Sequence, residues 1–173
     1  WSSDVCSSDL GKASPRLGVW TWADGAWKLV AWASLNMPEK RPAPGAPTFA
    51  GDDAATKDGS AMLTRYLGEQ RSKDYKAFDA MMDDALQVIN FKGQKLKADI
   101  AKGAEYATVT DPVIADARGT RCGGLTIVTC NLTMGQKIGF TSLPADPAPY
   151  LAVFQGTGDA AKVIALANTN KPK

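Results

Sequence analysis

The chain repeats one segment near its two ends, and this repeat constrains its fold more than any other feature. Residues 17–38 read LGVWTWADGAWKLVAWASLNMP, and residues 151–172 read LAVFQGTGDAAKVIALANTNKP. The two segments align without a gap from their first residue to their last. The identical pairs are Leu17/Leu151, Val19/Val153, Ala26/Ala160, Lys28/Lys162, Ala31/Ala165, Ala33/Ala167, Asn36/Asn170 and Pro38/Pro172. This pattern predicts a tandem repeat.

Each copy has the pattern of a β-hairpin. In the first copy, Asp24-Gly25 lies between two apolar runs, and this dipeptide favours the type I′ turn, in which both central residues need a positive φ. Such a turn predicts two apolar faces, one with Trp20, Trp22, Trp27 and Leu29, the other with Leu17, Val19, Val30 and Trp32. Because a lone hairpin is marginally stable in water, we expect both faces to be covered.

The first ten residues, WSSDVCSSDL, have no helical or strand periodicity. They resemble the translation, in one reading frame, of a common short-read sequencing adapter. We therefore expect residues 1–10 to be an adapter artefact and residues 11–37 to be the C-terminal hairpin of a truncated first copy. Residues 38–57, which contain four prolines, are expected to form a linker, and residues 58–173 a complete domain.

Within the complete domain the patterns alternate between helix and strand. Helices are predicted from Ser60 to Ser72, from an Asp74 cap to Asp83-Asp84, and over residues 95–102 with Gly103 as a left-handed C-cap. Strands are predicted over residues 85–91, 106–117, 125–134, 149–156 and 160–168, with a loop over 136–148. This order predicts an α+β fold in which a curved antiparallel sheet packs against helices.

Composition excludes several classes of protein. The chain has no histidine, which excludes a histidine general base and any histidine-ligated metal or haem. Its net charge of +2 is too small for a protein that tracks nucleic-acid phosphates. No apolar run approaches the ~18 residues of a membrane helix. Cys122 and Cys130 are predicted to be free thiols, and we expect no metal, cofactor, nucleic acid or membrane as a partner.

The order of elements, the Asp83-Asp84-Ala85 step and the hairpin VWTWADGAWKLVAWAS together resemble the nuclear-transport-factor-2-like (NTF2-like) superfamily. Within it, the sequence is most similar to the SnoaL-like and DUF4440 group. The resemblance covers residues 16–36 and 60–170. It implies a cone of curved sheet, closed by helices around an apolar pocket. It also implies a homodimer through the outer face of the sheet.

The superfamily includes steroid isomerases, and their residue pattern can be compared with this chain. The isomerase tyrosine corresponds to Tyr66, but the aspartate that serves as the general base corresponds to Ile89, with Asn90 beside it. Neither side chain accepts a proton at neutral pH. We therefore predict no catalytic residues and interpret Tyr66 as a core tyrosine.

The resulting hypothesis is a non-catalytic NTF2-like domain that binds a small apolar molecule. Its pocket is predicted to be lined by Tyr66, Met82, Asn90, Tyr106, Cys130 and Phe154. Two alternatives stay open. One is a cofactor-independent isomerase, cyclase or lyase of the ketosteroid-isomerase or SnoaL type, in which Tyr66 acts with an unrecognised acid. The other is a dimerisation or assembly module that uses the Trp-rich hairpin as a contact.

Overall fold

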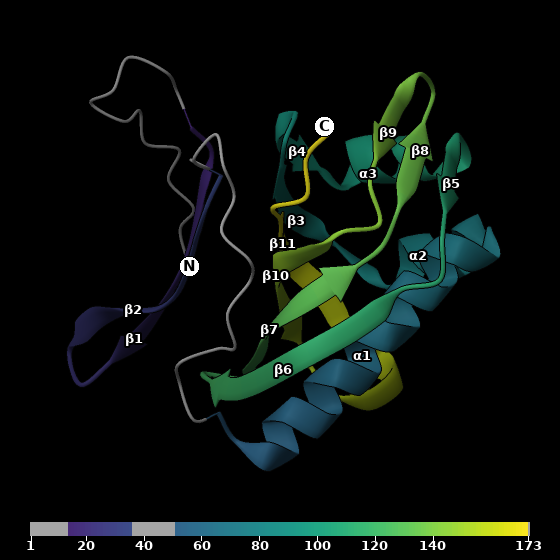
Figure 1. Ribbon diagram of the computed structural model, residues 1–173. Coiled ribbons are helices and arrows are strands. Elements are labelled where there is room, and N and C mark those ends of the chain that lie inside the picture. Colours follow the sequence, from purple (N-terminus) through teal and green to yellow (C-terminus); the bar gives the residue numbers. More distant parts are fainter. Residues whose placement is uncertain (1–13, 36–50, 173) are drawn as a thin grey trace.

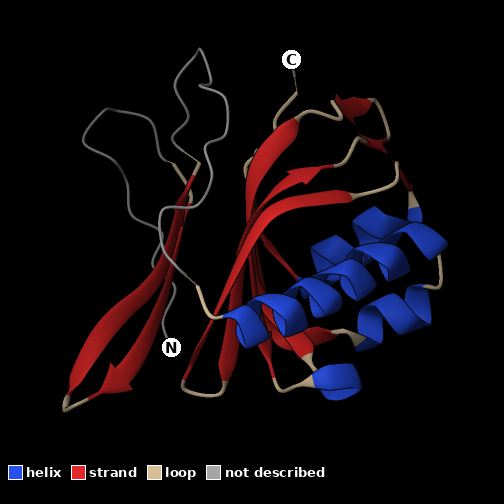
Figure 2. Cartoon of the chain, turned by 60° about the horizontal axis from the view of Figure 1, so that its bottom comes forward, coloured by secondary structure: helices blue, strands red, loops and turns tan. Residues whose placement is uncertain are grey.

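The computed structural model describes residues 14–35 and 51–172. The adapter-like residues 1–10 and most of the predicted linker lie outside these ranges. The described chain forms three layers: a hairpin, a six-stranded sheet, and helices on the opposite side of that sheet (Figures 1 and 2).

The helices are α1 (Asp53–Ser72), α2 (Tyr75–Ala80) and α3 (Lys97–Glu105). The separate hairpin consists of β1 (Arg16–Ala23) and β2 (Ala26–Ser34). The six-stranded sheet has the order β4 (Gly93–Leu96), β3 (Met82–Asn90), β11 (Lys162–Asn168), β10 (Pro147–Gln155), β7 (Leu125–Thr133), β6 (Val113–Cys122). A small third sheet contains β5 (Ala107–Val109), β8 (Gln136–Ile138) and β9 (Thr141–Leu143), and a 3₁₀ turn, η1 (Gly158–Ala160), precedes β11.

This architecture confirms the predicted α+β fold with a curved sheet packed against helices. Neighbouring strands of the large sheet pair antiparallel, except that β11 and β3 run parallel. Most of the domain lies between β3 and β11 in the sequence, so no hairpin joins these two strands. The long connection allows them to run parallel.

The turn of the first hairpin is as predicted. Asp24 and Gly25 have φ values of 54° and 74°, which the type I′ turn requires. Trp22 pairs with Trp27, and Trp20 pairs with Leu29.

The predicted position of Trp32 is wrong. The pairing register shifts between Val19 and Trp20, so Trp32 lies opposite Gly18. A Cβ added to Gly18 would meet both the Trp20 and the Trp32 rings, which places the two indoles on one face. The bulge therefore moves Trp32 to the face opposite Leu17 and Val19, and strict alternation could not reveal it.

The two hairpins share one pairing register. The pairs of β1 and β2 from Arg16↔Ser34 to Thr21↔Lys28 correspond one by one to the pairs of β10 and β11 from Tyr150↔Asn168 to Gln155↔Lys162. The register shift also recurs at the same place, between Val153 and Phe154. The likeness between the two segments therefore extends from residue identity to backbone pairing.

Two predicted helix boundaries are wrong. Helix α1 begins at Asp53 and not after Ser60, because Asp52 is the N-cap and its Oδ1 accepts a hydrogen bond from the Ala55 N–H (2.9 Å). The first turns of α1 are mostly polar and so lack the apolar period that marks the rest. The second helix starts at its Asp74 cap as predicted, but it ends at Ala80, and Asp83-Asp84 belong to β3.

Three further segments differ from prediction. Gly103 lies inside α3, whose C-cap is Tyr106, so Gly103 does not end that helix. The strand predicted over residues 106–117 is interrupted at Asp111-Pro112, where proline removes a backbone donor. The predicted loop over 136–148 contains the short strands β8 and β9. These strands have three residues each, too few for a periodic pattern.

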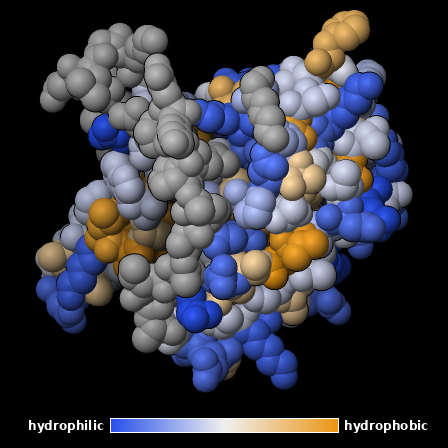
Figure 3. Space-filling view, viewed as in Figure 1, coloured by the Kyte–Doolittle hydropathy of each residue, from blue (hydrophilic) through white to orange (hydrophobic). Residues whose placement is uncertain are grey.

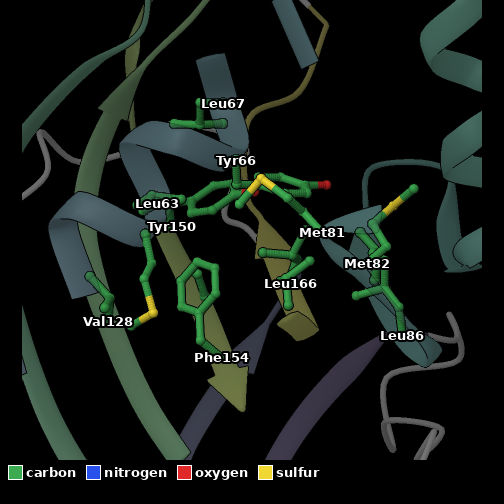
Figure 4. Close-up of a cluster of buried hydrophobic side chains, with 14 of the residues drawn as sticks. Leu63, Tyr66, Leu67, Met81, Met82, Leu86, Val128, Tyr150, Phe154 and Leu166 are labelled. Carbon is green, nitrogen blue, oxygen red and sulfur yellow. The ribbon is translucent and has the colours of Figure 1, made fainter. Parts of the chain in front are cut away.

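Two buried clusters hold the layers together. The inner cluster lies between the sheet and the helices and includes Leu63, Tyr66, Leu67, Phe154 and Leu166 (Figure 4). The outer cluster lies between the sheet and the hairpin β1–β2 and includes Leu17, Val19, Ile89, Leu151 and Val153. The sheet is therefore covered by apolar contacts on both faces.

The face seen in Figure 3 is mostly hydrophilic, with small separate hydrophobic areas. One hydrophobic projection lies over the turn between β8 and β9, where Phe140 is fully exposed. Among the described residues, no helix is both long and apolar enough to cross a membrane.

Candidate functional site

A pocket of about 260 Å³ opens between α3, the end of α1, the β3–β4 edge of the sheet and β8. Its walls come from elements far apart in the sequence. The lining residues are Tyr66, Gln70, Val88, Asn90, Lys92, Lys95, Asp99, Ile100, Gly103, Ala104, Ala107, Met134, Gln136, Ile138, Tyr150, Leu166 and Asn168.

Two buried tyrosines form part of the inner wall. Tyr66 of α1 packs against Phe78 of α2 with ring centroids 5.1 Å apart. Burial raises the pKa of Tyr66 well above its usual value, and burial together with nearby Tyr66 and Cys130 raises the pKa of Tyr150. Both hydroxyls therefore stay neutral over the physiological range, and each can donate or accept a hydrogen bond.

The other side of the pocket is polar and carries positive charge. Lys92 follows β3 and Lys95 lies in β4, and neither belongs to a salt bridge among the described residues. The Asn90 Oδ1 accepts a hydrogen bond from the Lys92 N–H (2.9 Å), which shapes the turn between the two strands. The amides of Gln70, Asn90, Gln136 and Asn168 add further donors and acceptors.

One acidic residue, Asp99, lines this pocket in the described part of the chain. Its Oδ2 accepts a hydrogen bond from the Leu96 N–H (3.0 Å) at the start of α3. Asp99 is thus bonded to the helix terminus, an arrangement that stabilises the helix.

The structure brings only part of the predicted site together. Tyr66 and Asn90 line the pocket. Met82, Cys130 and Phe154 lie in the buried inner cluster and are not among the residues that line the pocket. Tyr106 is 67 % exposed and does not appear in the wall of the pocket.

The alternation along β3 explains why the isomerase comparison gave no base at position 89. Ile89 is 2 % exposed and belongs to the outer cluster, so its side chain points away from the pocket. Its neighbours Val88 and Asn90 line the pocket instead. Neither of these side chains can act as a general base.

The sequence interpretation missed the lining residues from α3, β4 and β8. The run Lys92 to Ile100 carried a usable signal, because positive and polar residues follow directly on a buried strand. Gln136 and Ile138 carried none, since they lay in a segment predicted to be a loop.

Cys122 and Cys130 are free thiols in the structure, as predicted. Cys130 is buried, and this burial raises its pKa to about 12. Within residues 14–35 and 51–172, no group of three or more cysteine or acidic side chains could hold a metal ion.

Several solved structures have a fold similar to that of this chain. An NTF2-like protein from Cytophaga hutchinsonii is similar, with a TM-score of 0.58 and 17 % identity over 65 % of this chain and 94 % of that one. The chain has the NTF2-like fold. An NTF2-like protein of unknown function in nutrient uptake from Rhodospirillum rubrum is similar with a TM-score of 0.57 and 14 % identity. The match covers 66 % of this chain and 98 % of that one. A protein with a cystatin-like fold from Nostoc punctiforme is similar with a TM-score of 0.53 and 10 % identity. The match covers 72 % of this chain and 97 % of that one.

No protein-family model matches the sequence, and no curated protein does either. At these identities the likeness establishes the NTF2-like fold, and the activity must be argued from the pocket itself.

Proposed function

We propose that this NTF2-like domain binds a small molecule with an apolar body and an anionic or hydrogen-bonding end, without changing it chemically. The observation that carries the proposal is the pocket of about 260 Å³, whose inner wall is apolar and whose other side carries Lys92 and Lys95. Concave, largely preformed pockets with a few placed polar groups are typical of small-molecule sites.

The walls of the pocket give its ligand an orientation. Val88, Ile100 and Leu166 offer apolar contact, while the lysines offer charge-assisted hydrogen bonds to a carboxylate. The sequence alone favoured a wholly apolar ligand. The positions of Lys92 and Lys95 favour a ligand that also carries an acidic group.

A defined probe tests this proposal. The dissociation constant of 2-naphthoate is measured by calorimetry, with the neutral 2-naphthamide as the comparison ligand. We expect 2-naphthoate to bind more tightly than the amide, and Lys92→Gln with Lys95→Gln to remove the difference. Equal binding of both ligands, or no binding of either, would contradict the proposal.

A variant that fills the pocket supplies the control for location. Gly103 lines the pocket, and a Cβ added there meets no atom within 4 Å. Gly103→Leu therefore extends a side chain from a pocket-lining position whose Cβ site is open, and it should weaken 2-naphthoate binding at least tenfold. The matched variant Gly68→Leu, on an exposed part of α1 with equally open space, should leave binding unchanged.

The isomerase, cyclase or lyase alternative depends on Asp99, because this carboxylate shares the pocket with Tyr66. Its hydrogen bond to the Leu96 N–H supports a role as a helix cap. Isomerisation of a β,γ-unsaturated ketosteroid, followed by ultraviolet absorbance, separates the two roles. Turnover that disappears in Asp99→Asn and falls in Tyr66→Phe would favour the enzyme, whereas we expect no turnover by the unaltered chain.

We also propose that residues 11–37 are the C-terminal hairpin of a truncated copy of the unit formed by residues 58–173, and that this unit is of the SnoaL-like and DUF4440 kind. The shared pairing register and the shared bulge support this. Two unrelated hairpins would agree in turn type more readily than in the position of an irregularity.

A further inference from the structure

The hairpin β1–β2 exposes a large apolar surface on the side facing away from the sheet. We call this surface the indole face, and it consists of Trp20, Trp22, Trp27, Leu29 and Trp32. Trp22 is 59 % exposed, Trp27 56 %, Trp32 50 % and Leu29 46 %. Contiguous apolar surface on this scale marks an interaction site.

The corresponding positions of the second hairpin are core positions. In the alignment of the two copies, Trp20, Trp27, Leu29 and Trp32 correspond to Phe154, Ala161, Val163 and Leu166. These four are at most 3 % exposed and belong to the inner cluster between sheet and helices. The indole face therefore occupies the position of an inner sheet face.

The opposite face of β1–β2 corresponds to the outer face of the sheet and lies directly on it. Leu17 and Val19 share the outer cluster with their own counterparts, Leu151 and Val153. This contact fixes which side of the hairpin is outer and which is inner.

In the part of the chain that the structure describes, the two outer edges of β1–β2 lack the neighbouring strands that the second hairpin has. In the second copy, β10 pairs antiparallel with β7 and β11 pairs parallel with β3. In the described residues, β1 and β2 pair only with each other. Each outer edge of the hairpin therefore offers backbone donors and acceptors to a further strand.

We propose that the indole face is the inner wall of a second cone, and that its partner is a preceding segment of the same kind as residues 53–134. That segment adds an antiparallel strand along β1, a parallel strand along β2 and an amphipathic helix over the indoles. The inference rests on the tandem-repeat proposal and is independent of the pocket proposal. In the second copy, the helix cap Asp52 lies about 100 residues before Tyr150. Tyr150 is the counterpart of Arg16, so the preceding helix should begin about 100 residues before Arg16.

The chain carries its own probe of this surface. Of its five tryptophans, four lie on the indole face, and the fifth is Trp1. In a Trp1→Phe variant, tryptophan fluorescence therefore reports on the indole face alone. An indole in water emits at longer wavelength and is quenched by acrylamide more strongly than an indole in a core.

The experiment compares two proteins: the 173-residue chain with Trp1→Phe, and the product of the longest reading frame in the source DNA that contains residues 11–173. We expect the longer product to contain a helix-first segment with the predicted spacing. Its emission should lie to the blue of the shorter chain, and acrylamide quenching should fall several-fold.

Two outcomes would overturn the proposal. One is an upstream sequence without such a segment, or indoles that stay as accessible in the longer product as in the shorter one. The other is a concentration-dependent dimer of the 173-residue chain whose emission is already blue-shifted, since the occupant would then be another copy of this chain. A failure of either kind leaves 2-naphthoate binding to the pocket unaffected, so the two proposals fail separately.

Discussion

Leu17 and Leu151, which are aligned in the two similar segments, lie in one buried cluster on the outer face of the sheet. The resemblance had implied that this face joins two chains. In this chain β1–β2 lies on it, and Leu17 and Val19 share one buried cluster with Leu151 and Val153 and with Ile89 and Ile127 of other strands. The sheet face for which the resemblance implied a homodimer contact is thus covered by a hairpin of the same chain.

Substitution of Leu17 tests whether this contact holds the hairpin in place. Leu17 is 1 % exposed, so Leu17→Asp buries a charge and removes apolar contact worth about 2 kcal/mol. We expect the hairpin to detach, with faster hydrogen exchange and proteolysis over residues 16–34. Leu29→Asp is the matched control, because Leu29 is 46 % exposed on the indole face and should change neither rate. Equal effects of the two substitutions would refute this docking.

Gly119 tests the crossing of α1 over β6. Its carbonyl accepts a hydrogen bond from the Asp52 N–H (2.8 Å), and a Cβ there would meet the Ala55 carbonyl oxygen at 2.4 Å. Gly119→Ala should therefore lower the free energy of unfolding by about 1–3 kcal/mol. Gly68→Ala, in open space on the same helix, should raise it by about 0.5–1 kcal/mol. Urea denaturation measures both, and a neutral Gly119→Ala would contradict the close packing.

Alkaline pH should destabilise the fold through its buried acids. Burial raises the pKa values of Tyr66, Tyr150 and Cys130 above their ordinary values near 9–10. Above those ordinary values the unfolded chain loses protons that the folded chain retains, so stability falls as pH rises. Each group adds a slope of about 1.4 kcal/mol per pH unit until its folded pKa is reached.

Tyr66→Phe isolates one of these groups. The variant should lose stability with rising pH less steeply than the unaltered chain, by about 1.4 kcal/mol per pH unit above pH 10. Urea titrations at several pH values between 8 and 12 give the two slopes. Identical slopes would mean that the Tyr66 hydroxyl ionises as readily in the folded chain as in the unfolded one.

The sequence carried enough information for the fold but not for the pocket. The Asp24-Gly25 turn and the Asp74 cap each follow from local rules, and the structure confirms them. The pocket depends on which way β3 alternates and on where α3 and β8 lie against it. Those features are set by tertiary packing, so Met82 and Phe154 were expected in the wall and lie in the core instead.

The β-bulges in the two hairpins also could not be predicted from the sequence. Nothing in the residues at Val19/Trp20 marks a register shift, yet that shift moves Trp32 onto the indole face. The likeness between the two segments could have revealed the register shift only with a structure of the second hairpin, where the shift recurs at Val153/Phe154.

The location of bound 2-naphthoate tests the proposed function most directly, by amide and indole chemical shifts in ¹H–¹⁵N spectra of the labelled chain. We predict that titration shifts the backbone signals of Asn90, Lys95 and Gly103, which line the pocket, and leaves the indole signals of Trp22 and Trp27 in place. Shifts confined to those indoles, with the pocket signals unmoved, would contradict it.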